Sequence, residues 1–85
     1  MNGILLGMPR THSLLSDSFS KVVKNRREAK EISRAALAEK AGLHQTYIGL
    51  LERGERSPNL DTAKAIAKAL NTSLSNLIKE AEEVK

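Results

Sequence analysis

Gly42 is the residue that most constrains the fold of this chain, because it interrupts a helical pattern that restarts at once. The segment from Ala35 to Gly54 reads AALAEKAGLHQTYIGLLERG. If this segment were one long helix, alanine at position 42 would be more favourable by roughly 1 kcal/mol. Glycine instead suits the left-handed residue that ends a helix. The pattern therefore predicts two short helices, residues 34–41 and 45–53, joined by a tight turn.

The residues around Gly42 predict how these two helices meet. Ala38 is small enough for close contact, and apolar anchors lie on both sides of the turn: Leu37, Ala41, Leu43, Ile48 and Leu51. Two helices that cross at about 90–120° through a short turn form a helix-turn-helix. We therefore expect residues 34–53 to form such a corner.

The rest of the chain predicts three more helices and no strand. From Ser16, an expected N-cap, apolar and basic residues recur at helical spacing: Phe19, Val22, Val23, Arg26, Arg27 and Lys30. Asn59 is expected to cap a helix over residues 60–70, whose inward face holds Ala63, Ile66, Ala67 and Leu70. Ser33 and Ser73 are the other expected N-caps, the latter for a helix from residue 74 to about 84. The sequence thus predicts an all-α, compact five-helix bundle.

The first fifteen residues lack helical periodicity. We expect residues 1–15 to be an N-terminal arm, flexible or partly disordered. Residues 16–85 then form one domain, which a chain of 85 residues can accommodate.

Composition argues against catalysis and against a metal or cofactor site. The chain has no cysteine and two isolated histidines, which excludes disulfides and thiolate metal sites. It lacks a glycine-rich phosphate loop, a Ser/His/Asp grouping and metal-ligand spacing. We therefore expect no enzyme activity, no cofactor and no metal. The apolar runs are too short to span a membrane and no signal peptide is evident, so we expect a cytoplasmic protein.

The positive charge is unevenly distributed. The net charge is +4, and residues 1–58 carry ten Lys and Arg against six Asp and Glu, whereas residues 59–85 carry four of each. This asymmetry indicates an anionic partner on the side of the first two thirds. Charge alone leaves nucleic acid, an acidic protein and a membrane surface as candidates.

The third predicted helix has an outward face that suits base contacts in DNA. With Ile48 and Leu51 inward, that face holds Gln45, Thr46, Gly49, Leu50 and Arg53. Glutamine can pair with adenine, and threonine or leucine can pack on a thymine methyl group. The alternatives are that Gln45 and Thr46 are solvated residues opening a helix, and that Leu50 lies at the edge of the core.

The combination of LAEKAGL, YI, ERG, SPNL and IAKALN resembles the lambda-repressor-like, or Cro/cI-type (XRE), helix-turn-helix transcription regulators. The resemblance covers about residues 19–78 and implies that the third helix reads bases. It makes Gln45, Thr46 and Leu50 the base-facing residues, and it implies that Arg27 pairs with Glu52 to brace the recognition helix. The phosphate-contacting residues that it implies are Ser33, Arg34, His44, Tyr47, Arg53 and Arg56. His44 could instead act as a cap, and Tyr47 could pack at the edge of the domain.

Two positions depart from that family pattern, since the family usually has serine at Gly49 and a polar residue at Leu50. Within the family, the Thr46-Tyr47-Ile48 run is similar to the controller proteins of restriction–modification systems. Small phage-type repressors and DNA-binding antitoxins look nearly the same.

These features together predict a sequence-specific regulator of transcription that binds double-stranded DNA as a homodimer on an inverted repeat. The dimer interface is expected on one face of the last helix, at Leu74, Leu77, Ile78 and Ala81. This stripe is first of all core, and any part of it left exposed would suit a two-fold contact. No residues remain for a domain that senses a small molecule. One alternative is an antitoxin-type or adaptor module that binds a protein through an exposed Leu50–Tyr47 patch. The other is a nonspecific nucleic-acid binder.

Overall fold

Five helices follow one another in the computed structural model, which describes the backbone of residues 4–83 and the side chains of residues 15–83. They are α1 (Ile4–Ala29), α2 (Arg34–Ala41), α3 (Gln45–Glu52), α4 (Leu60–Ala69) and α5 (Leu74–Glu83). The predicted all-α, five-helix fold is confirmed for this part of the chain. Of the helices described, none has both the length and the apolar character needed to cross a membrane.

Side-chain caps fix where three of the helices begin. The oxygen of Ser33 accepts a hydrogen bond from the backbone N–H of Ala36 at 3.0 Å, before α2. Asn59 accepts one from Thr62 at 2.7 Å before α4, and Ser73 accepts one from Asn76 at 3.0 Å before α5. Such bonds satisfy N–H groups that have no partner inside the helix, so all three predicted caps are confirmed.

The core is built from the apolar faces that the sequence predicted. Every inward residue expected on α4 is buried, as are the corner anchors Leu37, Ile48 and Leu51. Ala41 and Leu43 are only partly buried and pack against the edge of this core. The largest fully buried side chains are Leu37, Ile48, Leu51, Ile66, Leu70, Leu77, Val22 and Val23.

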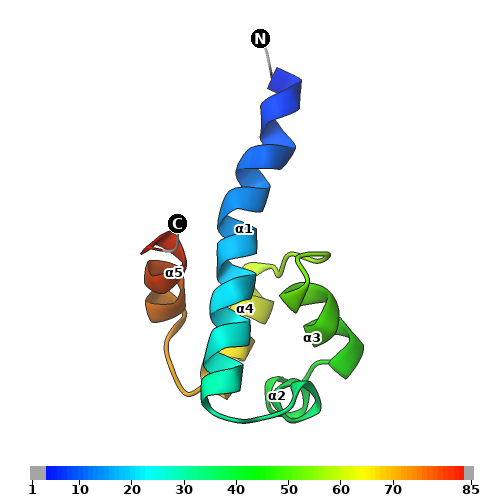
Figure 1. Ribbon diagram of the computed structural model, residues 1–85, viewed down its shortest axis with the longest axis vertical. Coiled ribbons are helices and arrows are strands. Elements are labelled where there is room, and N and C mark those ends of the chain that lie inside the picture. Colours follow the sequence, from blue (N-terminus) through cyan, green and yellow to red (C-terminus); the bar gives the residue numbers. More distant parts are fainter. Residues whose placement is uncertain (1–3, 84–85) are drawn as a thin grey trace.

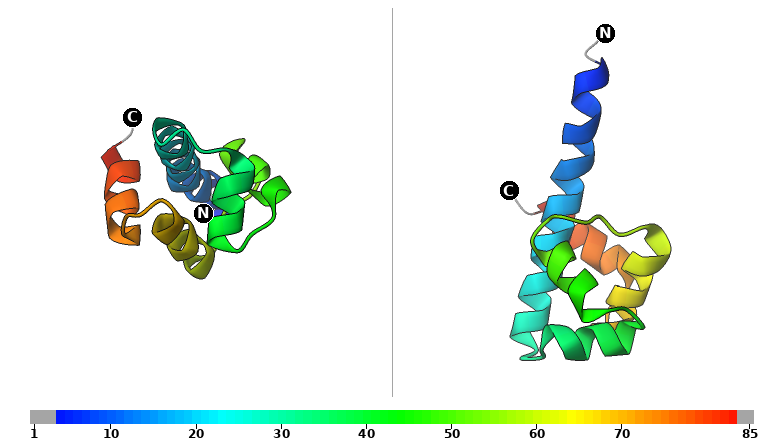
Figure 2. Two further views of the ribbon diagram at one scale, coloured as in Figure 1. Left: turned by 90° about the horizontal axis from the view of Figure 1, so that it is seen from below. Right: turned by 90° about the vertical axis from the view of Figure 1, so that its right-hand side faces the viewer.

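The helices pack around α1, which runs the full height of Figure 1 with α5 on one side and α3 on the other. Helix α2 lies across the lower end of α1 and packs against both α3 and α4. Arg26 on α1 also forms an ion pair with Glu80 on α5 at 2.9 Å. The two views of Figure 2 show that α2 and α3 form one corner of the molecule.

Helix α1 begins much earlier than the sequence indicated. It starts at Ile4, so the expected start at Ser16 is wrong, and Ser16 lies inside the helix. The prediction relied on helical periodicity in the sequence, but a helix can extend beyond a periodic segment, because each added residue extends turns that have already formed. In Figure 1 the first half of α1 projects beyond the other helices. The division into an arm over residues 1–15 and a domain over residues 16–85 stays a prediction, and residues 1–3 lie outside the described range.

Candidate nucleic-acid interface

The turn at Gly42 holds α2 and α3 at a fixed angle through backbone hydrogen bonds. Gly42 has a φ of 73°, in the left-handed region that glycine adopts most easily. Its N–H donates to the carbonyl of Glu39 at 3.2 Å, and the N–H of Leu43 donates to the carbonyl of Ala38 at 2.8 Å. This pair of bonds is the Schellman motif, and Leu43 then packs against the core. The corner predicted from Gly42 is therefore present.

The first turn of α3 presents polar side chains at the surface. Gln45 and Thr46, predicted to face bases, are both exposed. His44 occupies the N-cap position and is exposed, but its side chain makes no capping hydrogen bond. The start of α3 therefore offers the two predicted base-contacting residues, together with a histidine that is not used as a cap.

Leu50 and Tyr47 are both half-buried on α3. Tyr47 packs against the core. Burial raises the pKa of its hydroxyl group, and the positive charge of Arg56 acts in the opposite direction. The two residues therefore do not form a fully exposed apolar patch.

Gly49 lies on the predicted face of α3 together with Arg53, but it is not open to the surface. It is buried, and the side chain of Arg53, one turn later, covers it. A β-carbon built at Gly49 would lie 3.3 Å from Nη1 of Arg53. The helical spacing places both residues on one face, but only the folded structure shows that the longer one lies over the other.

Glu52, the last residue of α3, accepts hydrogen bonds from two arginines. Its side chain is 1% exposed, and Arg27 donates to its two oxygens from Nε at 2.6 Å and from Nη2 at 3.1 Å. Arg34, the first residue of α2, donates from Nε to Oε1 of Glu52 at 2.9 Å. Arg27 also donates from Nη1 to the carbonyl of Ile32 at 2.9 Å. One buried carboxylate thus joins α1, α2 and α3, whereas the sequence had suggested only the pair of Arg27 and Glu52.

The two arginines keep Glu52 charged. Burial acts to raise the pKa of Glu52, but the hydrogen bonds and positive charges of Arg27 and Arg34 outweigh it and hold the pKa below its ordinary value. The hydrogen bond to Glu52 likewise raises the pKa of Arg27, against the effect of burial. A second carboxylate, that of Glu28, lies 3.9 Å from Nη2 of Arg27 and also favours its charged form.

The other predicted phosphate-contacting residues surround the start of α2 and the end of α3. The oxygen of Ser33 is used as a cap, but its hydroxyl can still donate. Arg53 pairs with Glu55 at 3.0 Å, and both side chains are 55% exposed. Arg56 is also exposed. Since salt bridges between exposed side chains are weak, Arg53 can exchange Glu55 for another anion at little cost.

The predicted dimer face of α5 is only partly at the surface. Leu77 and Ala81 are 0% and 1% exposed, so placing them in a dimer interface is wrong: they belong to the core of the single chain. Leu74 and Ile78 pack against that core but remain partly exposed. Both lie at the rim of the buried stripe of α5, which the sequence could not divide into core and rim.

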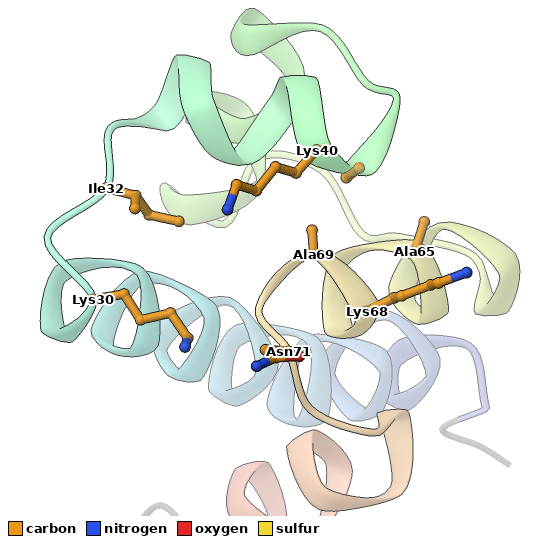
Figure 3. A pocket seen from close by; sticks show the side chains of 8 residues that line it. Lys30, Ile32, Lys40, Ala65, Lys68, Ala69 and Asn71 are labelled. Atoms are coloured by element: carbon orange, nitrogen blue, oxygen red, sulfur yellow. The ribbon is translucent and has the colours of Figure 1, made fainter.

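A hollow of about 690 Å³ lies between the ends of α1, α2 and α4 and contains no residue of α3. Figure 3 shows the side chains of Lys30 and Lys40 reaching into it from opposite sides, while that of Lys68 points away. Lys40 and Lys68 lie in the last turns of their helices, and Lys30 directly follows α1. Positive charge at these positions compensates the negative ends of the helix dipoles, which accounts for the lysines without a ligand. Among the described residues, no group of acidic residues and histidines could hold a metal ion.

Comparisons with known proteins point to one family. A family model described as helix-turn-helix matches residues 23–77. The control protein C.SmaI of Serratia marcescens is 42% identical over 64 residues, which cover 75% of this chain and 76% of that protein. An immunity repressor protein of Bacillus phage phi105 is 33% identical over 63 residues, covering 74% of this chain and 44% of the repressor.

A solved structure matches over a similar range. The crystal structure of the restriction-modification controller protein C.AhdI of Aeromonas hydrophila superposes with a TM-score of 0.69 at 33% identity. The match covers 72% of this chain and 92% of that one. All three similar proteins are named as controller or repressor proteins.

Proposed function

This chain belongs to the XRE, or Cro/cI-type, family of helix-turn-helix DNA-binding transcriptional regulators, and from that membership we propose that it reads a specific operator in double-stranded DNA. Helix α3 enters the major groove, with Gln45, Thr46 and Leu50 facing the bases. A helix of this width fits the groove, and its first residues reach the base edges.

The observation that carries this proposal is the exposure of Gln45 and Thr46 at the start of α3. Neither side chain is occupied with capping, and the rest of α3 is anchored by the buried Ile48 and Leu51. A rigid helix with free hydrogen-bonding groups at its tip suits base reading, because the geometry is fixed before DNA arrives.

Phosphate contacts fix the register without reading sequence. We assign them to the start of α2, the start of α3 and the loop after α3: Ser33, Arg34, His44, Tyr47, Arg53 and Arg56. Backbone N–H groups at the two helix starts add to this grip.

The operator is an inverted repeat bound by a homodimer. Leu74 and Ile78 on α5 supply the apolar part of the contact between the two copies, since both are partly exposed. Two-fold symmetry then spaces the half-sites about one helical turn, ~34 Å, apart. Control comes from protein concentration and dimerisation, which makes regulation of its own promoter the expected mode.

The biological context that fits best is that of a restriction–modification controller or a phage-type repressor acting in the cytoplasm. The names of the similar proteins C.SmaI and the phage phi105 repressor support it. Loss of regulation of its own promoter on deletion of the gene is the expected result. Unchanged expression of a reporter from that promoter would contradict autoregulation.

A binding selection tests the proposal directly. The purified protein is offered random-sequence duplexes at ~0.15 M salt, where nonspecific phosphate binding is weak. We expect enrichment of an inverted repeat. Recovery of duplexes without a shared sequence would indicate a nonspecific binder. If no duplex is retained, an adaptor or antitoxin-type role would replace the proposal, although half-burial of Tyr47 leaves little of the patch that this role needs.

Substitution of Gln45 separates base reading from phosphate binding. Gln45→Ala should cost ~1–3 kcal/mol on the selected operator and relax the preference at one base position, because one bidentate contact is lost. Arg34→Ala should weaken binding to all sequences alike. Affinities for the operator and for its single-base variants check both expectations, and equal losses on every duplex for both changes would remove the base-reading role.

A further inference from the structure

Arg34 is held by a residue that does not face DNA itself. Its Nε donates to Glu52 at 2.9 Å, and this carboxylate is already bonded to Arg27 by two hydrogen bonds. Because Glu52 is 1% exposed and fixed by Arg27, it offers Arg34 an immobile partner. A side chain as long as arginine would otherwise sample many rotamers.

The geometry of this contact leaves the outer edge of the guanidinium group for another ligand. Arg34 uses Nε toward Glu52, and its side chain is 44% exposed, compared with 10% for Arg27. A guanidinium group has a second edge, formed by its two Nη atoms, whose spacing matches two phosphate oxygens. Holding Nε inward therefore turns that edge toward the surface.

The place of Arg34 in the fold also leaves it available to an anion. Arg27 is paired with Glu52 and lies 3.9 Å from Glu28, whereas Arg34 shares Glu52 with Arg27. The first turn of α2 contains no acidic residue, and Arg34 is its first residue. A cation is unfavourable at the positive end of a helix dipole, so Arg34 does not stabilise α2 by its position. A phosphate at this helix start would be favoured both by the dipole and by the guanidinium group.

We propose that Glu52 is a positioning residue for DNA binding: it holds Arg34 by Nε so that the two Nη groups grip a backbone phosphate. The inference rests on the DNA binding proposed above. Glu52 is the last residue of α3, so its carboxylate couples the phosphate contact at the start of α2 to the position of the recognition helix. Arg27, which fixes Glu52, does not itself contact DNA in this scheme.

A double-mutant cycle with Arg34→Ala and Glu52→Gln tests the proposal. Affinity is measured on a duplex of fixed sequence over a range of salt concentrations, because phosphate contacts are independent of sequence. Arg34→Ala should weaken binding about tenfold and lower the salt slope by about one. Glu52→Gln should weaken binding at least fivefold more in the presence of Arg34 than in the Arg34→Ala background.

A purely structural role of Glu52 predicts a different result. If Glu52 acted only as a brace through Arg27, its substitution would cost the same affinity in both backgrounds, and this additivity would overturn the proposal. Circular dichroism and thermal melts identify a temperature at which all four proteins are folded, and the affinities are measured at that temperature. The cycle remains interpretable even if Glu52→Gln lowers the melting temperature.

Arg34→Lys is the second, conservative test. Lysine keeps the positive charge but lacks the planar fork, so it cannot bind Glu52 at one edge and phosphate at the other. We expect a loss of affinity close to that of Arg34→Ala, with a salt slope near that of the wild type. Binding by Arg34→Lys equal to that of the wild type would show that charge alone matters, and would overturn the role of Glu52.

The matched control is the pair of Arg26 and Glu80, which joins α1 to α5 at 2.9 Å with half-exposed side chains. The cycle of Arg26→Lys and Glu80→Gln should leave DNA affinity unchanged. Failure of the proposed function can be distinguished from failure of this inference. A protein that binds all duplexes alike has no specific operator, but the double-mutant cycle can still be measured on any duplex. A protein that binds no duplex overturns both proposals.

Discussion

At the residue scale, the molecule depends unusually strongly on Glu52. A carboxylate that is almost fully buried costs free energy to desolvate, and it is stable here because two arginines surround it. Removing one member of such a cluster lowers the free energy of unfolding by more than the contact itself contributes, because the remaining charges stay buried without their partner. Position 52 is therefore more sensitive to substitution than any exposed charged position of the chain.

Glu52 should make the stability of the protein depend on acid. Its pKa in the folded state lies below the ordinary value of 4.5. As the pH falls below that value, the unfolded chain takes up the proton first, so the free energy of unfolding decreases until the folded carboxylate is also protonated. The stabilisation is thus complete above about pH 5 and is lost as the pH falls through the lowered pKa of the folded state.

Glu52→Gln tests this linkage by denaturant unfolding at several pH values. We expect a loss of about 3 kcal/mol at neutral pH, since a buried pair is broken, and a smaller difference from the wild type at pH ~3. Glu80→Gln, which removes a half-exposed carboxylate, should retain the acid-dependent loss of the wild type. A difference between Glu52→Gln and the wild type that stays constant with pH would contradict the assignment.

At the element scale, the corner contains two glycines, and replacing them should change the stability of the protein in opposite directions. Gly42 has a φ of 73°, and a β-carbon there would meet nothing within 4 Å, so an alanine would be strained by the backbone conformation alone. Gly49 has ordinary helical geometry and contacts only the mobile end of Arg53. The same substitution at these positions should therefore have opposite signs.

Gly42→Ala should lower the free energy of unfolding by about 1–2 kcal/mol, the cost of a left-handed residue with a side chain. Gly49→Ala is the matched control and should raise it by about 0.5–1 kcal/mol, because alanine is the better helix former. Thermal or denaturant unfolding measures both. A stabilising Gly42→Ala would mean that the turn relaxes to another conformation.

Much of the element structure was predictable because its signals are local. Helix α2 begins after Ser33 and ends before Gly42, as expected, because a side-chain cap and a left-handed glycine act on neighbouring backbone groups. The early start of α1 was not predictable, because the sequence of residues 1–15 shows no helical periodicity. Predicted helix ends also ran one residue too far at Arg53 and Leu70, which are caps.

At the scale of the whole molecule, dimer formation and DNA binding should depend on the same exposed residues of α5. Leu74→Lys combined with Ile78→Lys should raise the dissociation constant of the dimer at least tenfold, because two charges would face each other across the two-fold axis. Sedimentation at several protein concentrations measures this, together with the loss of cooperative operator binding.

The single exposed-surface change Lys64→Ala on α4 is the control and should leave the dimer intact. Leu74 and Ile78 also touch the core, so thermal melts must show that the double variant is folded. A folded double variant that remains a dimer would move the interface away from α5.

Apart from the pair of Arg27 and Glu52, which the family resemblance implied, the candidate site was predicted where chain neighbours define it. Gln45 and Thr46 follow from the turn before them, and their exposure was expected. The contact of Arg34 with Glu52 joins residues 18 apart in sequence, and no spacing rule indicates it. The same is true of the division of the α5 stripe into buried and partly exposed residues, which depends on where other helices lie. It is also true of the covering of Gly49, which depends on the conformation of Arg53.

The packing of α1 against α5 also determines when the protein can fold during its synthesis. The first and last helices of the described chain are direct neighbours, and the core includes Leu77 and Ala81 near the end. Until α5 has emerged from the ribosome, the side of α1 that packs against it is uncovered. The corner of α2 and α3 is synthesised earlier, yet the complete core of these helices forms only after α5 has emerged.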